Sequence, residues 1–300
     1  MNANNVLEQL HGWEISGRVE IVSGSGGLPL IQIRTPVSTA EIYLHGAQIT
    51  AFQKNGEPPL LFLSEKSYFA PDKAIRGGVP ICFPWFGSRT GEPAHGFARI
   101  TEWELISTSA TPNGIVTVRL QLPKASLKPE WSGLRAEFIV TIAADLTMEL
   151  VATNGSPGTA LQIEGCLHNY FRVGDISAVS ISGLEGTSFL DNTTGGAGPS
   201  ILDNDPVIKI SKEIDRTYLD TTGPIEIRDE NLKRIIRVEK FNSHSTVVWN
   251  PWTTKPMADL GPAEYKNMVC VEAGNVKKNK LSLAPGESSA MKVMLSSRGI

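Results

Sequence analysis

Two titratable side chains stand in runs that otherwise have the composition of buried strands. His168 lies within the aromatic run of residues 164–171, and Glu272 ends the apolar run of residues 268–272. A histidine inside a β-core costs free energy unless its ring nitrogens are paired, and a buried carboxylate needs a partner or a function. Imidazole and carboxylate are also groups whose proton affinity a protein can tune towards neutral pH. Each residue is therefore either a satisfied structural group or part of a site that faces a cavity.

Arg76 lies in a segment, residues 74–87, that cannot form a regular strand. The segment contains two prolines, three glycines and three aromatic residues. Because proline donates no ladder hydrogen bond and glycine favours special backbone angles, we expect a shaped loop that lines a cavity. In this loop Arg76 could donate two parallel hydrogen bonds to an anion or to sugar oxygens, or it could simply brace the loop.

A second basic segment places His95 and Arg99 four residues apart around a glycine and an aromatic residue. His95 could bond only to the backbone, or it could form an anion pocket together with Arg99 and Arg76. Trp249 and Trp252 flank an Asn-Pro pair. They could form a wall on which a sugar stacks, or they could pack in the core or at its rim.

Composition limits the classes of function. The 300 residues carry 28 Lys and Arg against 31 Asp and Glu, with 41% hydrophobic residues and a pI near 6.0, which is typical of an ordinary folded chain. Such a chain has no general basic field for nucleic acid or an anionic membrane, so any anion site must be local. Neither a signal peptide nor an apolar stretch of membrane-spanning length is present. We expect a cytoplasmic protein with no nucleic-acid or membrane partner.

Familiar cofactor and metal motifs are missing from the sequence. Three cysteines without CxxC spacing favour a reducing compartment over a disulfide framework or a zinc site, and the five histidines lack ligand spacing. GxGxxG after a strand, GxxxxGK[ST], HExxH and GxSxG are all absent. We therefore expect no metal and no nucleotide or redox cofactor.

Period-two alternation dominates the chain and predicts its fold. Val116, Val118, Leu120 and Leu122 share one face of a half-buried strand, and residues 138–142 and 146–150 form a predicted hairpin. Short helical turns are expected at residues 6–10 and after Pro262. We predict an all-β protein, one large antiparallel β-sandwich domain over residues 1–300 with a few short helices. The other predicted strands are residues 19–22, 30–34, 40–44, 177–181, 225–227, 235–241, 246–249, 268–272 and 291–295.

Taken in order, these segments resemble the hexose-6-phosphate mutarotases, a branch of the aldose 1-epimerase (galactose mutarotase-like) superfamily often called glucose-6-phosphate 1-epimerases. The resemblance extends from about residue 40 to the C-terminal strands. Its motifs are IRGGVP at residues 75–80, PWFG at 84–87, HGFAR at 95–99, HNYF at 168–171, DRTY at 215–218 and VE at 271–272.

The resemblance implies a β-sandwich whose concave face holds a sugar, with His168 as the acid and Glu272 as the base. It also implies substrate-binding roles for Arg76, His95, Arg99 and Asp215. Some members carry a glutamine directly before the HGFAR-type stretch, where this chain has Ala94. Any sugar contact from that glutamine is therefore not expected here.

The function expected from this resemblance is that of an isomerase without a cofactor. It would interconvert the α and β anomers of a hexose 6-phosphate, with glucose 6-phosphate favoured because Arg76 and Arg99 could bind the phosphate. Two alternatives stay open: an epimerase for unphosphorylated aldoses, and a carbohydrate-binding protein that lost its chemistry. The presence of both His168 and Glu272 argues against the second, because binding alone needs no acid–base pair.

Overall fold

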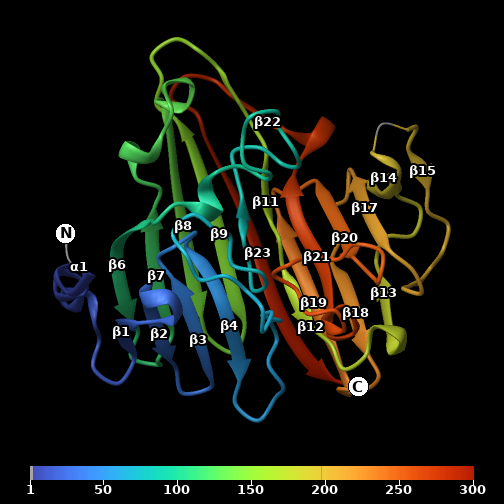
Figure 1. The fold of residues 1–300 in the computed structure, drawn as a ribbon, viewed down its shortest axis with the longest axis horizontal. Helices are drawn as coiled ribbons and strands as arrows, with labels where there is room; N and C mark the ends of the chain where they lie inside the picture. Colours follow the sequence, from blue (N-terminus) through green and yellow to red (C-terminus); the bar gives the residue numbers. More distant parts are fainter. Residues whose placement is uncertain (1–2, 197) are drawn as a thin grey trace.

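The computed structural model describes residues 3–196 and 198–300 (Figure 1). Within this part of the chain, α1 (Ala3–Leu10) is the one α-helix, and it fulfils the prediction for residues 6–10. The predicted turn after Pro262 is the short 3-10 helix η8 (Glu264–Asn267). No helix among the described residues combines the length and apolar character that crossing a bilayer requires.

Two large sheets and two small ones make up the rest, and their strand pairs are antiparallel. The nine-stranded sheet has the order β16 (Ile208–Lys209), β13 (Val179–Ser182), β18 (Ile225–Asp229), β19 (Arg234–Phe241), β23 (Ser288–Gly299), β9 (Leu146–Asn154), β8 (Leu134–Ile142), β7 (Val116–Gln121) and β6 (Glu104–Ala110). The eight-stranded sheet has the order β15 (Ile201–Leu202), β14 (Ser188–Asp191), β17 (Ile214–Leu219), β20 (Ser245–Asn250), β21 (Met268–Asn275), β11 (Gly165–Leu167) and β5 (Ile81–Cys82), and β12 (Tyr170–Arg172) also pairs with β21. The small sheets are β1 (Val19–Ser23), β2 (Pro29–Arg34), β3 (Ser38–Tyr43) and β4 (Gln48–Lys54), and the pair β10 (Leu161–Ile163) and β22 (Leu281–Leu283).

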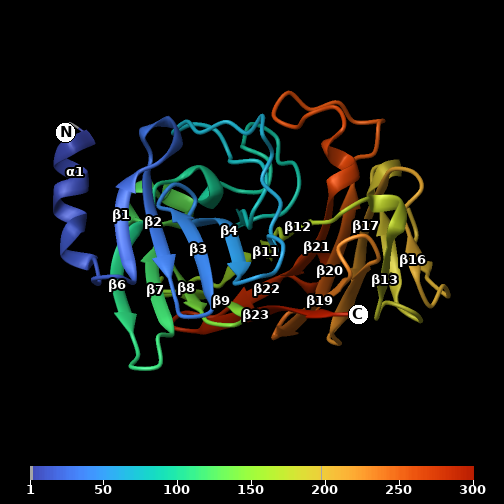
Figure 2. The ribbon, with the colours of Figure 1, turned by 90° about the horizontal axis from the view of Figure 1, so that it is seen from below.

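The sheets form two layers. Figure 2 shows β1–β4 over the β6–β9 half of the nine-stranded sheet, while β21, β20 and β17 lie over its other half. Strict alternation of buried and less buried residues in β8 and β9 explains this packing, because each strand turns one apolar face to the core. The predicted antiparallel all-β sandwich is confirmed. One hydrophobic cluster contains residues from Val19 to Leu295. That residues 1–300 form a single domain stays a prediction.

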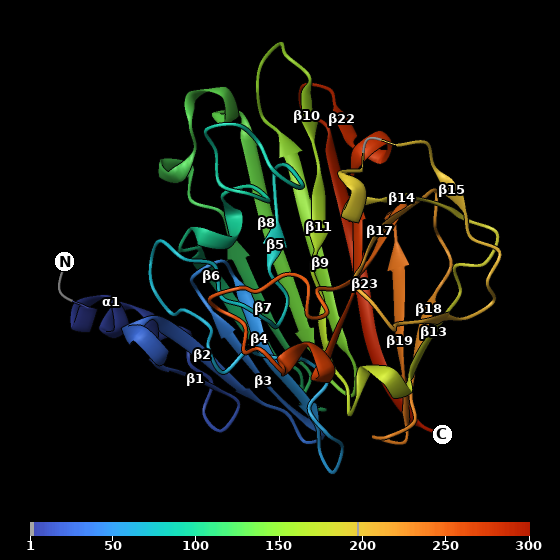
Figure 3. The ribbon, with the colours of Figure 1, turned by 45° about the vertical axis from the view of Figure 1, so that its right-hand side comes forward.

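β20 and β21 are buried along their whole length. One face of these strands meets the core between the layers, so loops must cover the other face. Figure 3 shows the connection between β20 and β21 folded in front of the sheet. Side chains on this covered face are therefore held by strands below and loops above.

Two strand predictions are wrong in detail. Residues 164–171 do not form one continuous strand, because the ladder stops after Leu167 and resumes at Tyr170. In the gap, the side-chain amide of Asn169 donates to the carbonyl of Val271 at 3.1 Å in place of a backbone bond. β13 begins at Val179 rather than at residue 177, because the Asp175 carboxylate accepts the Ser177 N–H and caps a 3-10 turn.

Lys240, on β19, is a buried amine that the sequence patterns do not single out. Its side chain is 6% exposed, and its Nζ donates to Thr221 Oγ1, Thr246 Oγ1 and the Ser245 carbonyl at 2.6, 2.8 and 3.1 Å. Burial lowers the pKa of Lys240 from its ordinary 10.5 to about 7. In the unfolded chain the amine stays protonated over the interval between these values, so the unfolded state holds more protons.

We therefore expect stability to rise with pH above neutrality. Between pH 7 and pH 8.5 the Lys240 contribution to the free energy of unfolding should increase by about 1.6 kcal/mol. Chemical denaturation of Lys240→Met beside the wild type measures this contribution, because other groups titrate alike in both. Thr221 and Thr246 already hydrogen-bond to each other at 2.9 Å, so the substitution should leave both hydroxyl groups with a partner. Equal pH slopes for the two proteins would contradict the prediction.

Candidate active site

An open pocket of about 580 Å³ lies on the covered face of the eight-stranded sheet. The structure brings all six residues singled out from the sequence to its lining, although they come from five separate parts of the chain. They are Arg76, His95, Arg99, His168, Asp215 and Glu272. Trp249 of β20 lines the pocket as well, whereas Trp252 does not and packs on Tyr265 with ring centroids 5.1 Å apart.

Strand register explains the floor of the pocket. Alternate residues of a strand share a face, so Cys270, Glu272 and Gly274 of β21 project the same way. Gly274 is opposite Cys166 of β11, and a Cβ on Gly274 would lie 2.9 Å from the Cys166 sulfur. Because Gly274 has no side chain, the Cys166 thiol fits beside it and donates to Glu272 Oε2 at 3.4 Å.

His168 and Glu272 form a direct pair at the base of the pocket. His168 Nε2 lies 3.2 Å from Glu272 Oε1, and their side chains are 10% and 1% exposed. The imidazole stacks on Tyr170, with centroids 4.6 Å apart and planes 8° from parallel, and it meets the Trp249 ring edge to face. His168 Nδ1 is buried without a hydrogen-bond partner among the described residues. Packing rather than a second hydrogen bond therefore sets the orientation of the ring.

Burial shifts both pKa values of this pair towards the uncharged forms. It lowers the pKa of His168 well below 6.5, with a further contribution from His95 and Arg76, and it raises the pKa of Glu272 well above 4.5. Between these two pKa values the pair holds one proton. That proton has a donor and an acceptor within one hydrogen-bond length, so the pair can act as acid and base in turn.

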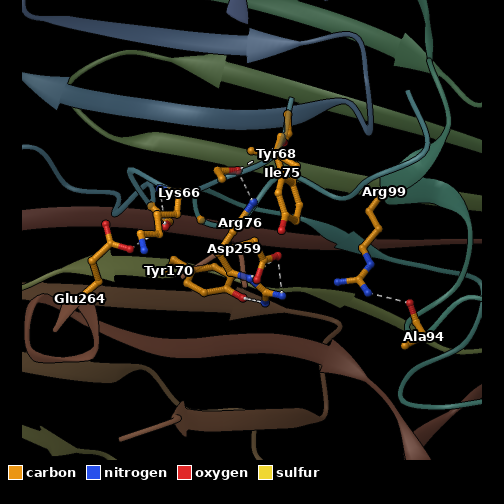
Figure 4. A network of polar contacts seen from close by, with 12 residues as sticks. Lys66, Tyr68, Ile75, Arg76, Ala94, Arg99, Tyr170, Asp259 and Glu264 are labelled. Atoms are coloured by element: carbon orange, nitrogen blue, oxygen red, sulfur yellow. Dashed lines mark hydrogen bonds and ion pairs between the residues drawn. The ribbon is translucent and has the colours of Figure 1, made fainter. Parts of the chain in front are cut away.

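Arg76 both lines the pocket and braces a loop, so neither interpretation of its sequence context excludes the other. Its Nε and Nη2 donate to Asp259 Oδ2 at 3.1 and 3.0 Å, and its Nη1 donates to the Tyr170 hydroxyl at 2.9 Å (Figure 4). Asp259 belongs to the connection between β20 and β21. The charge of Arg76 is thus compensated within the protein.

No carboxylate among the described residues compensates the charge of Arg99 in this way. Its Nη2 donates to the carbonyl of Ala94 at 2.8 Å, and its Nε is buried without a partner in the described part of the chain (Figure 4). Arg99 and Arg76 both line the pocket. A guanidinium bonded only to a backbone carbonyl keeps its charge available for an anion.

His95 also combines a backbone bond with a place in the pocket. Its Nδ1 accepts the N–H of Gly87 at 3.3 Å, so Nε2 is assigned the ring proton and is free to donate. Burial, together with Arg99, Arg76 and Lys277, lowers the pKa of His95 to about 3. His95 is therefore a neutral donor at physiological pH, with its ring centroid 6.1 Å from that of His168.

Asp215 of β17 supplies a carboxylate. Its Oδ1 accepts from Asn192 Nδ2 at 2.8 Å, and Lys255 Nζ lies 3.7 Å from its Oδ2. Burial raises the pKa of Asp215 from 3.8. Such a carboxylate can accept hydrogen bonds from hydroxyl groups of a ligand.

Three charged residues around the pocket do not stand out in the sequence: Lys255, Asp259 and Lys277. Lys255 and Asp259 lie in the irregular connection between β20 and β21, and Lys277 begins the short 3-10 helix η9 (Lys277–Asn279). No periodicity places these side chains, so tertiary structure alone reveals them. One group could hold a metal ion, because ligand atoms of His168, Cys270 and Glu272 lie within 4.8 Å of one another. The expectation that the chain needs no metal stays a prediction.

Comparisons with known proteins agree with this geometry. The family described as aldose 1-epimerase matches residues 29–296. A protein of Cenchrus ciliaris is 35% identical over 92% of this chain and 87% of its own length, and one of Escherichia coli K12 is 36% identical over 82% of each. The names of both give glucose-6-phosphate 1-epimerase as a proposed activity. A solved structure from Salmonella typhimurium, described as a proposed mutarotase, has a TM-score of 0.85 at 27% identity and covers 98% of this chain and 100% of that one.

Proposed function

The chain belongs to the aldose 1-epimerase family, and from this premise we propose that its substrate is a hexose 6-phosphate, with glucose 6-phosphate as the first candidate. The observation that carries the proposal is Arg99, an uncompensated guanidinium in the same pocket as the His168–Glu272 pair. A 6-phosphate carries close to two negative charges at neutral pH, which such a cation can bind. The names of the two relatives agree with this substrate.

In the proposed mechanism, ring opening uses both members of the pair. Glu272, as the carboxylate, takes the proton of the C1 hydroxyl while His168, as the imidazolium, gives a proton to the ring oxygen. The bond between C1 and the ring oxygen breaks and the C1 carbonyl forms. This step turns a charged pair into an uncharged one, and burial of both groups favours that direction.

Ring closure runs the same transfers backwards. After rotation about the C1–C2 bond, His168 takes the proton from the C5 hydroxyl, whose oxygen attacks the other face of the aldehyde. Glu272 returns its proton to O1. Each group regains its starting state, and electrons and protons balance without an external reagent. O1 and the ring oxygen are both bonded to C1 and so lie close together. The distance of 3.2 Å between His168 Nε2 and Glu272 Oε1 lets the two groups reach both oxygens at once.

The proposed substrate is tested by comparing two sugars. Polarimetry or exchange NMR on glucose 6-phosphate and on glucose, each with and without the protein, gives both rates above the spontaneous background. The proposal expects a higher kcat/KM for the phosphorylated sugar. Equal or higher kcat/KM on glucose would favour an epimerase for free aldoses, and no catalysis on either sugar would favour a carbohydrate-binding protein.

The two arginines should differ in their effect. Replacing Arg99 with alanine should raise KM for glucose 6-phosphate by roughly 10- to 100-fold, as expected for a lost hydrogen bond to a charged group. Arg76→Ala should weaken the binding of both sugars to the same extent, because Asp259 already compensates the Arg76 charge. Steady-state kinetics of both variants on both sugars check this. A loss confined to the phosphorylated sugar in Arg76→Ala, with Arg99→Ala unaffected, would exchange the two roles.

A further inference from the structure

Four cations other than histidine line the pocket, and they differ in whether a carboxylate lies close enough to neutralise their charge. Arg76 pairs with Asp259, and Lys255 Nζ lies 2.7 Å from Glu213 Oε1 and 3.7 Å from Asp215 Oδ2. Lys277 has no carboxylate within ion-pair distance among the described residues. With Arg99, it is one of two lining cations whose charge is left for a ligand.

These two cations also lie at the same end of the pocket. Arg99 donates to the carbonyl of Ala94, which directly precedes His95, and Glu164 joins the Lys277 backbone to Phe86, whose ring packs on His95 with centroids 4.8 Å apart. The rings of His95 and His168 are neighbours in turn. In a hexopyranose the C6 group is attached to C5, directly beside the ring oxygen. When His168 gives its proton to the ring oxygen, the C6 substituent must therefore lie on the side of His168 and His95. The uncompensated charge is where a 6-phosphate would be.

The backbone holds Lys277 in a defined position. Its φ of 58° is in the left-handed region, which a lysine adopts only when the surroundings enforce it. Glu164 supplies that restraint: its Oε1 accepts the Lys277 N–H at 2.6 Å, and its Oε2 accepts the Phe86 N–H at 3.0 Å. One carboxylate thus ties together two segments that line the pocket, although the ammonium end of Lys277 stays exposed.

We propose that Lys277 is a specificity-determining residue that binds the 6-phosphate together with Arg99. This inference rests on the proposed function, since it assigns a further ligand to the same substrate. A guanidinium and an ammonium can share the oxygens of one phosphate, with Arg99 giving directional hydrogen bonds and Lys277 acting as a point charge. Lys277 is not needed for proton transfer at C1, so its removal should change binding rather than chemistry.

The test uses Lys277→Met, with Lys278→Met as the matched control. Lys278 is the next residue, pairs with Asp220 and lies outside the pocket, so its replacement makes the same change in net charge. For Lys277→Met we expect KM for glucose 6-phosphate to rise about tenfold while kcat changes less than about twofold. The kcat/KM ratio of glucose 6-phosphate to glucose should fall about tenfold, and Lys277→Arg should recover most of it. Lys278→Met should leave the ratio as in the wild type.

A second probe separates this inference from the proposed function. Inorganic phosphate should inhibit wild-type anomerisation of glucose competitively, and Lys277→Met should raise its Ki about tenfold. If the wild type preferred glucose over glucose 6-phosphate, the proposed substrate would be wrong, yet a raised phosphate Ki would still support an anion site at Lys277. An unchanged KM and Ki in Lys277→Met, or equal shifts in Lys278→Met, would overturn the inference.

Discussion

Replacing Glu272 with glutamine is expected to lower kcat for anomerisation by about 10²-fold or more, the scale of a lost general base. Glutamine keeps the shape of the side chain and can still hydrogen-bond to His168, but it cannot take the proton of the C1 hydroxyl. The substitution also removes a carboxyl group whose buried ionisation is costly, so the fold should be retained. Polarimetry on the purified variant, with circular dichroism to verify folding, measures the effect.

Glu137→Gln is a suitable control for this variant. Glu137 pairs with Arg119 on the surface and lies outside the pocket, so its loss should leave kcat within about twofold of the wild type.

The pH profile gives a second readout. In the wild type, kcat/KM should fall below the lowered pKa of His168 and above the raised pKa of Glu272, because the pair must hold one proton. Glu272→Gln removes one of the two titrating groups, so its kcat/KM should fall on only one side of the pH profile. A folded variant with the wild-type rate would exclude Glu272 as the base.

Local alternation explains how much of the fold the sequence predicts. Residues 116–122 and the hairpin of residues 138–150 have one apolar face each, and the burial of β7, β8 and β9 follows that pattern. The interruption at residues 168 and 169 does not follow from any local pattern. It depends on the side chain of Asn169 replacing a ladder bond to Val271, a residue about a hundred positions away in the chain.

The candidate site, like the fold, could be predicted from the sequence only in part. Arg76, His95 and Arg99 stand in segments whose proline and glycine content excludes a regular strand, so the sequence marks them as unusual. That they meet His168 and Glu272 followed only from the resemblance to a family, because no spacing along the chain encodes a pocket built from distant segments.

The charge balance of the pocket was beyond sequence reasoning. Asp259 is 183 residues from Arg76, yet it decides whether that arginine is free for an anion. Lys277 is one lysine of a pair, and nothing in the sequence distinguishes it from Lys278. Only the tertiary structure shows that one faces the pocket and the other pairs with Asp220.

His168→Ala is the second substitution with a large expected effect. Removing the imidazole takes away the one proton donor that the proposed mechanism places at the ring oxygen, so kcat should fall by about 10²-fold or more. KM should change much less than kcat, because the cations that hold the sugar phosphate are separate residues. His244→Gln is the matched control, since His244 is exposed and lies outside the pocket.

The same substitution also removes a ring that packs on Tyr170, so stability needs its own measurement. His168→Gln fills more of that space, and it should show the same loss of kcat if proton delivery is the cause. If both variants fold and both lose about 10²-fold while KM stays nearly constant, the effect lies in chemistry and not in packing. Wild-type kcat in either folded variant would mean that the ring oxygen receives its proton from another group, of which His95, the neighbouring imidazole, would be the next to replace.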